Sequence, residues 1–216
     1  MISQIKAIVF DLGGVIIDLN RQAAVDALSK LGVPGVDLLL GEYGQNGPFL
    51  DLETGKLTAA DFYDHLRYLA INAGAEAPDD KILQDAFNAF LVKLPTERLQ
   101  RLLEVRQAGF ATYVLSNTNP VMFNSWIAEA FAQEGLRIND YFDGVVTSFQ
   151  AGMCKPEPLL FKRVLTRYKL IPASTLMLDD SIANCNAARS VGMQAIQIGA
   201  TPDNDMMHAT SLLLKK

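Results

Sequence analysis

The stretch AIVFDLGG, residues 7–14, decides the fold of this chain, because four apolar residues run directly into Asp11 and a glycine-rich bend follows. A short apolar run that ends in such a bend is typical of a buried strand in a parallel sheet. The strand then presents Asp11 at the edge of the sheet. At that position a carboxylate can serve as a nucleophile, as a metal ligand or as the cap of a following helix.

Strand-like runs recur along the chain, with amphipathic helical patterns between the later ones. Further strands are predicted at residues 111–116, 144–148, 175–180 and 194–199, and helices at 96–109, 121–135, 157–169 and 184–192. Short apolar strands that alternate with helices indicate βα units on a parallel sheet. We therefore predict an α/β fold with a doubly wound, Rossmann-like parallel sheet.

The interval from residue 20 to residue 92 interrupts this alternation. It contains helical patterns at residues 21–32, 57–74 and 80–92, joined by connectors rich in glycine and proline, and no convincing strand. We predict that residues 1–19 and 93–216 form the α/β core and that residues 20–92 form an inserted α-helical cap domain. Ligands of open α/β sheets bind at the carboxyl ends of the strands, so the cap is expected over that edge.

Composition narrows the class of protein. The chain has 216 residues, of which 50% are hydrophobic, and a net charge of −5. It shows no basic stripe for nucleic acid and no apolar run of the ~20 residues that a membrane span needs. The two cysteines, Cys154 and Cys185, are expected to be reduced, so a cytoplasmic location is predicted without nucleic-acid or membrane partners. Oligomeric state is not indicated by the sequence.

Polar side chains follow four of the predicted strands. They are carboxylates, a hydroxyl, an amide and one amine: Asp11, Ser116, Asn117, Lys155, Asp179 and Asp180. Because the carboxyl ends of parallel strands share one edge, these groups are expected to converge. Carboxylates suit Mg²⁺, and a hydroxyl with backbone N–H groups can hold phosphate oxygens. The pattern predicts a site for Mg²⁺ and a small phosphorylated substrate.

Within this site the amine and the first carboxylate have complementary properties. Lys155 can neutralise charge on a phosphoryl group and keep Asp11 ionised. An ionised aspartate that faces a metal-bound phosphate is a competent nucleophile. Taken singly, each residue also has an ordinary explanation, such as a helix cap, a turn residue or a solvated lysine. Their joint placement at the strand ends favours chemistry.

The stretches VFDLGG, VLSNTN, GMCKPEP and LDDSIANCNAARSVGM resemble, in this order, the four motifs of the haloacid dehalogenase superfamily of phosphohydrolases. The predicted insert resembles the α-helical cap of that superfamily. Within it, FDLGGVIIDLN, LETGKLTAADF, LSNTN and GMCKPEP are most similar to bacterial α-D-glucose-1-phosphate phosphatase and its relatives. The resemblance implies a Mg²⁺-dependent phosphatase of a small phosphomonoester, such as a sugar 1-phosphate, that works through an aspartyl-phosphate intermediate.

The resemblance also implies a role for each residue. Asp11 is the nucleophile and Lys155 the catalytic cation, which binds the phosphate together with Ser116 and Asn117. The expected metal ligands are two groups beside the nucleophile and two consecutive carboxylates: Asp11, the Gly13 carbonyl, Asp180 and Asp179. Asp180 is preferred over Asp179 as the direct ligand.

Gly13 is a departure from the resemblance. Most phosphatases of the superfamily carry a second aspartate at this position, which protonates the leaving alcohol and later activates water. Three interpretations follow: a substrate with a better leaving group, a proton supplied by bound water or a cap residue such as Glu42, or a weak enzyme that mainly binds a phospholigand or partner. A metal-independent dehalogenase is a further alternative, against which the paired Asp179 and Asp180 argue.

Overall fold

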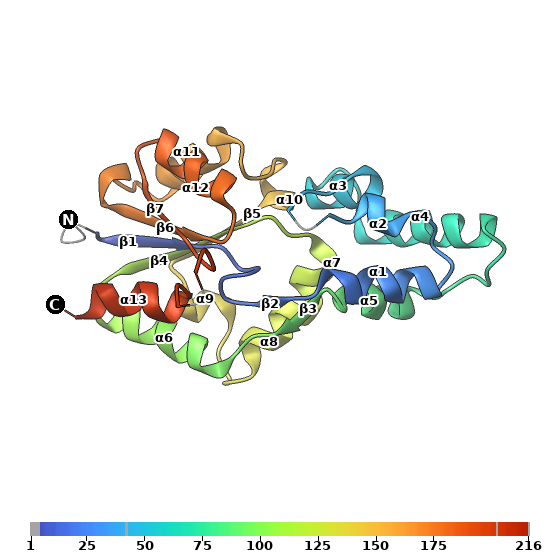
Figure 1. Ribbon diagram of the computed structural model, residues 1–216, viewed down its shortest axis with the longest axis horizontal. Helices are drawn as coiled ribbons and strands as arrows, with labels where there is room; N and C mark the ends of the chain where they lie inside the picture. Colours follow the sequence, from blue (N-terminus) through green and yellow to red (C-terminus); the bar gives the residue numbers. More distant parts are fainter. Residues whose placement is uncertain (1–4, 42, 202, 216) are drawn as a thin grey trace.

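The computed structural model describes residues 5–41, 43–201 and 203–215. One end of the molecule is a parallel sheet between helices, and the other end is a helical insert that extends from the sheet (Figure 1). Both ends of the described chain lie at the end of the molecule opposite the insert (Figure 1). The predicted α/β fold with a helical insert is confirmed.

The central sheet has five parallel strands in the order β5-β4-β1-β6-β7. Their bounds are Ala7–Phe10 (β1), Ala111–Ser116 (β4), Gly144–Thr147 (β5), Thr175–Asp179 (β6) and Gln194–Gln197 (β7). The first strand lies in the middle, and Phe10 pairs with Val114 on one side and Leu178 on the other. All four residues of β1 are buried, as expected for a strand that is covered on both faces.

Alternate residues of β1 face the two layers of helices. Ala7 and Val9 belong to the apolar cluster that includes α11 and α12, whereas Ile8 and Phe10 belong to the cluster that includes α6 and α13. The helical segments of the core are α6 (Thr96–Gln107), α7 (Pro120–Met122), η2 (Phe123–Ile127), α8 (Ala128–Ala132), α9 (Ile138–Tyr141), α10 (Ser148–Ala151), α11 (Pro158–Arg167), η3 (Pro172–Ser174), α12 (Ile182–Ser190) and α13 (Met206–Leu214). The helix predicted at 121–135 is therefore helical as far as Ala132, with a π-helical turn at η2.

The insert packs its helices around an aromatic centre. Its helices are α1 (Arg21–Lys30), α2 (Val36–Leu39), α3 (Gly47–Glu53), α4 (Ala59–Asn72) and α5 (Asp80–Asn88). The rings of Phe49, Phe62 and Phe87, from three different helices, lie 5.1–5.3 Å apart between centroids. Phe49 therefore ties α3, a helix that the sequence did not predict, to the predicted helices α4 and α5.

A short antiparallel ribbon lies where the insert leaves and rejoins the core (Figure 1). It pairs β2 (Asp18–Leu19) with β3 (Leu91–Lys93). The prediction of a helix as far as residue 92 is wrong, because α5 ends at Asn88 and the chain becomes extended to form this ribbon. The predicted domain limits remain predictions: the limit at 19/20 lies at the end of β2, and the limit at 92/93 lies within β3.

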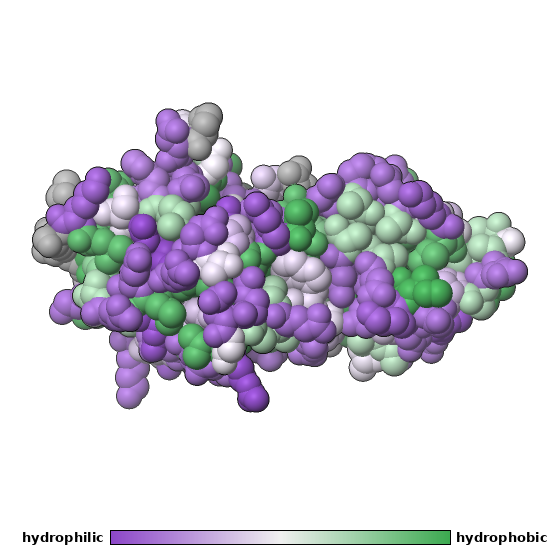
Figure 2. Space-filling model, turned by 90° about the horizontal axis from the view of Figure 1, so that it is seen from below, coloured by the Kyte–Doolittle hydropathy of each residue, from purple (hydrophilic) through white to green (hydrophobic). Residues whose placement is uncertain are grey.

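The surface is mixed in character. Polar side chains cover most of the face shown in Figure 2, and the apolar residues form separate small groups between them. Within the residues that the structure describes, no helix has the length and apolar character needed to cross a membrane.

Candidate active site

A tight bend follows β1 and sets the position of Asp11. The N–H of Asp11 still donates to Leu178 O at 2.9 Å, so the sheet fixes its backbone. Gly14 has a φ of 69°, and a Cβ at this glycine would lie 2.3 Å from Asp180 Oδ2. The second glycine of the motif therefore meets two needs at once: a left-handed backbone and close approach of a carboxylate.

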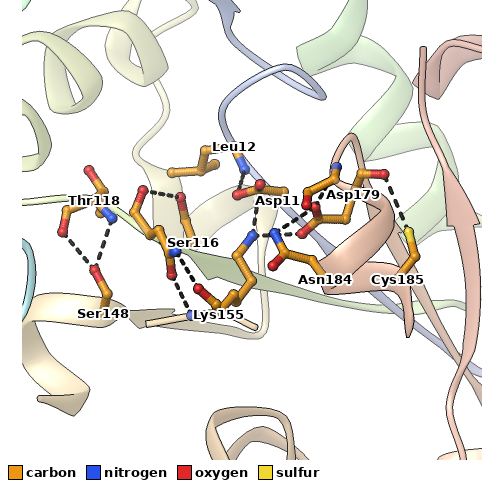
Figure 3. A network of polar contacts seen from close by, with 11 residues as sticks. Asp11, Leu12, Ser116, Thr118, Ser148, Lys155, Asp179, Asn184 and Cys185 are labelled. Carbon is orange, nitrogen blue, oxygen red and sulfur yellow. Dashed lines mark hydrogen bonds and ion pairs between the residues drawn. The ribbon is translucent and has the colours of Figure 1, made fainter. Parts of the chain in front are cut away.

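Lys155 lies between two carboxylates (Figure 3). Its Nζ is 2.7 Å from Asp11 Oδ2 and 2.7 Å from Asp179 Oδ2, and all three residues are buried. Asp179 Oδ1 accepts two further hydrogen bonds, from the N–H of Ser181 and from Asn184 Nδ2, each at 2.9 Å. Asp179 is thus held by a cation and two donors, and it in turn holds the amine beside Asp11.

The segment after β4 positions Lys155 from the other side. Asn117 Nδ2 donates to the carbonyl of Lys155 at 2.9 Å, and Asn117 Oδ1 accepts from its N–H at 2.8 Å. The Asn117 side chain therefore fixes the lysine backbone; its predicted contact with substrate remains a prediction. Ser116, 2% exposed at the end of β4, lines the same cavity as Asp11 and Lys155.

Charge in the site is unbalanced. Burial alone would lower the pKa of Lys155, but Asp11 and Asp179 raise it above its ordinary value, so the amine is charged. Burial raises the pKa of Asp11 to about 7; Lys155 opposes this shift, while the charges of Asp179 and Asp180 add to it. One cation thus faces three carboxyl groups, and a further positive charge would favour their ionised forms.

The three carboxyl groups form a suitable site for that charge. One oxygen of each of Asp11, Asp179 and Asp180 lies within 4.8 Å of the others. Carboxylate oxygens are ligands that Mg²⁺ accepts, usually one or two per ion beside water and phosphate. Asp11, Gly13 and Asp180 line the cavity, whereas Asp179 is 0% exposed and lies behind them. The preference for Asp180 over Asp179 as the direct ligand stays a prediction.

A cavity of about 100 Å³ joins this cluster to the insert. The core contributes the polar groups described above, and the insert contributes mainly apolar residues together with Glu53: Leu40, Tyr43, Gln45, Phe49, Phe87, Phe90 and Leu91. Glu53 is a site residue that the sequence does not predict, although it belongs to the stretch LETGKLTAADF. Glu42, the cap residue predicted there as a proton donor, lies outside the described residues.

Glu53 is a buried carboxyl group with a weak partner. It ends α3, is 6% exposed, and Oε1 accepts a hydrogen bond from the Cys154 thiol at 3.5 Å. Burial raises the pKa of Glu53 to about 7, while that hydrogen bond and the charge of Lys155 oppose the shift. Burial and the nearby Glu53 raise the pKa of Cys154 to about 12, so the thiol keeps its proton and donates.

Comparison with known proteins is consistent with this geometry. The haloacid dehalogenase-like hydrolase family matches residues 5–192. The D-ribitol-5-phosphate phosphatase of Bacteroides thetaiotaomicron is 37% identical over 193 residues, which cover 89% of this chain and 91% of that enzyme. The glyceraldehyde 3-phosphate phosphatase of Pyrococcus furiosus is 27% identical over 210 residues, which cover 89% of this chain and 80% of that enzyme.

A solved structure has the same fold and contains ions relevant to the site. It is a crystal structure of a haloacid dehalogenase family enzyme from Bacteroides thetaiotaomicron, an aspartate-to-alanine variant in complex with magnesium and inorganic phosphate. It matches this chain with a TM-score of 0.87 and 32% identity, over 98% of this chain and 100% of that one.

Proposed function

This chain belongs to the haloacid dehalogenase-like hydrolase family, and we propose that it is a Mg²⁺-dependent phosphatase of small phosphorylated sugars or polyols. One observation carries the proposal: the Lys155 amine bridges Asp11 and Asp179 at 2.7 Å each, beside a cavity that Asp180 also lines. This arrangement holds an aspartate next to a fixed cation, as attack on a phosphate requires.

We propose that hydrolysis takes place in two steps, attack by Asp11 and then attack by water. Lys155 and the hydroxyl of Ser116 hold the phosphate oxygens, and an oxygen of Asp11 attacks phosphorus while the bond to the leaving oxygen breaks. Water then attacks the aspartyl-phosphate, which releases phosphate and restores Asp11. Asp11, Asp180, the Gly13 carbonyl and, behind them, Asp179 are the groups that would hold Mg²⁺. When bound, the ion supplies positive charge to the phosphate and to these carboxylates.

Two predictions from the sequence are confirmed at this level. The chain is a phosphoric monoester hydrolase of its family, and Mg²⁺ is its metal, in agreement with its phosphatase relatives and with the magnesium-bound structures. These findings favour a phosphatase over the dehalogenase and binding-module alternatives. Cys154 and Cys185 are free thiols, and the cytoplasmic location stays a prediction.

The substrate is the finer part of the proposal. The two phosphatases compared above are phosphatases of esters with short carbon chains, and ribitol 5-phosphate is the first candidate. A cavity of about 100 Å³ favours a small substrate. A sugar 1-phosphate, expected from the glycine at position 13, is the second candidate, because its anomeric oxygen needs less help to leave.

A substrate panel tests the proposal. Phosphate release should be measured from ribitol 5-phosphate, glucose 1-phosphate, glucose 6-phosphate and p-nitrophenyl phosphate, with Mg²⁺ and with excess chelator, and halide release from 2-chloropropionate. We expect Mg²⁺-dependent release from at least ribitol 5-phosphate and p-nitrophenyl phosphate, and no halide. Halide release that survives chelation, or no phosphate release from any ester, would overturn the proposal.

A further inference from the structure

We propose that Glu53 is the acid/base residue of this phosphatase: its carboxyl group protonates the leaving oxygen and then accepts a proton from the attacking water. This inference rests on the proposed function and deepens it, since it assigns the step for which the core motif has no side chain. It places a catalytic group on the insert, opposite the nucleophile, rather than in the loop after β1.

The loop after β1 provides no side chain for the acid/base step. Gly13 lines the cavity but offers only its backbone there. Of the other carboxyl groups that line it among the described residues, Asp11 is paired with Lys155, and Asp180 belongs to the acidic cluster that suits a metal. Glu53 remains, from the facing side of the same cavity.

The surroundings of Glu53 leave its carboxyl group available. Its one described hydrogen bond comes from the Cys154 thiol at 3.5 Å, a weak donor. A carboxyl group that only stabilises a fold is normally better satisfied when it is this deeply buried. The apolar rings of Phe49 and Phe87 line the same cavity as Glu53, and both are buried.

The pKa of Glu53 suits an acid/base residue. Among the described residues, the titratable groups that act on its pKa are Cys154 and Lys155, on the loop after α10, and neither outweighs the effect of burial. Its pKa of about 7 lies where a single group can donate a proton in one step and accept one in the next. Near neutral pH both forms are populated.

The proposed cycle balances. Asp11 attacks phosphorus, the bond from phosphorus to the leaving oxygen breaks, and that oxygen takes the Glu53 proton to leave as an alcohol. The Glu53 carboxylate then takes a proton from water as the water oxygen attacks phosphorus. The bond between phosphorus and Asp11 breaks, phosphate leaves, and both residues return to their starting forms.

The test compares native protein with Glu53→Gln, in Mg²⁺, on two esters of different leaving-group quality. With ribitol 5-phosphate, a poor leaving group, we expect kcat to fall ~10²–10⁴-fold at an unchanged KM. With p-nitrophenyl phosphate, whose leaving group needs no proton, we expect a rapid burst of one nitrophenolate per site to persist while steady turnover slows. With ribitol 5-phosphate, the kcat of the native protein should decrease above neutral pH as Glu53 loses its proton. The variant should not show this decrease.

The control is Glu76→Gln, an exposed glutamate between α4 and α5, which should match native protein on both esters. An equal slowing of the burst and of ribitol 5-phosphate turnover by Glu53→Gln, or an effect confined to KM, would overturn the acid/base role and leave Glu53 as a structural or hydroxyl-binding group. Failure of the native protein to hydrolyse either ester would instead refute the proposed function, and this inference with it.

Discussion

Replacing Glu53 by glutamine should make the protein more stable at alkaline pH while leaving its stability at acid pH nearly unchanged. The carboxyl group is 6% exposed, and burial raises its pKa from an ordinary value of 4.5 to about 7. The folded state therefore binds this proton more tightly than the unfolded state. Its stabilising contribution is complete below the unfolded pKa and is lost as the pH rises through the folded one.

The magnitude follows from these two pKa values. Above pH 7 the ionised side chain must remain in a buried site, and one pKa unit corresponds to about 1.4 kcal/mol. Integrated over the interval, the contribution of Glu53 to the free energy of unfolding should fall by about 2.5 kcal/mol between pH 5 and pH 8. Glutamine has nearly the same shape and no proton to lose, so the variant should lack this fall.

The assay is urea unfolding of native protein and Glu53→Gln at pH 5 and pH 8, under the same Mg²⁺ concentration. At each pH, the free energy of unfolding of the native protein is subtracted from that of the variant. This difference should be about 2.5 kcal/mol larger at pH 8 than at pH 5. The subtraction cancels the contribution of titrating groups that both proteins share, such as Asp11, to the pH dependence of stability. Glu76→Gln, an exposed substitution, should show no such shift.

One result would refute this reasoning: a free-energy difference between native protein and variant that is the same at both pH values. Glu53 would then titrate alike in the folded and unfolded states, and its burial would not raise its pKa. The acid/base role would lose its support from electrostatics, although the kinetic test on two leaving groups would still decide it.

The remaining predictions concern the nucleophile, the acidic cluster and the glycines of the loop after β1. Asp11→Asn should abolish turnover with a native circular dichroism spectrum, because an amide does not attack phosphorus; near-native activity would disprove the covalent route. Exhaustive chelation should remove activity and lower the Tm, with both restored by Mg²⁺, because without the metal ion the three carboxylates of the acidic cluster face only one cation, Lys155, and repel one another. Gly14→Ala should destabilise by ~1–3 kcal/mol in urea unfolding, since its φ is 69° and Asp180 blocks a side chain, whereas Gly13→Ala displaces only the flexible Leu19. Gly13→Asp introduced into Glu53→Gln should restore part of the kcat on ribitol 5-phosphate; no recovery in a folded double variant would indicate that the lost step is not proton transfer.

The core of the fold could be predicted because its signals are local. Each strand of the parallel sheet is a short apolar run, and residues 7–10 alternate between two helical layers that the sequence also marks. The β2–β3 ribbon could not, since strands of two and three residues show no periodicity. Their pairing joins Asp18 to Lys93, far apart along the chain.

The sequence does not predict helix α3, for a different reason. The stretch before it, GEYGQNGP, is rich in turn-forming residues and predicts a connector, yet Gly47 and Pro48 form the first turn of the helix. Pro48 is compatible with that position because an N–H there has no partner inside the helix. The helix then places Phe49 in the aromatic centre and Glu53 in the cavity, which only tertiary packing reveals.

Among the site residues, those at strand ends could be predicted and their mutual contacts could not. The sequence predicts Asp11, Lys155 and Asp180 from their place after strands, which fixes the edge of the sheet where they lie. The Asn117 side chain makes two hydrogen bonds with the backbone of Lys155. The sequence does not predict these bonds, because they depend on how the loop after β4 packs against the loop after α10. Glu53 lies 101 residues from its partner Cys154, so no local pattern could have indicated its burial.

The loop after α10 connects the two halves of the proposed chemistry. Its consecutive residues have different partners: the Cys154 thiol donates to Glu53 on the insert, and the Lys155 amine binds Asp11 on the core. Asn117 holds the backbone of this loop by two hydrogen bonds, so the segment has little freedom to shift. A nucleophile on the sheet and an acid on the insert must keep their separation to within a fraction of an ångström for one substrate to meet both. The loop after α10 meets that requirement, because it is fixed by Asn117 and contacts the carboxyl groups of both Asp11 and Glu53. No second aspartate in the loop after β1 is then needed.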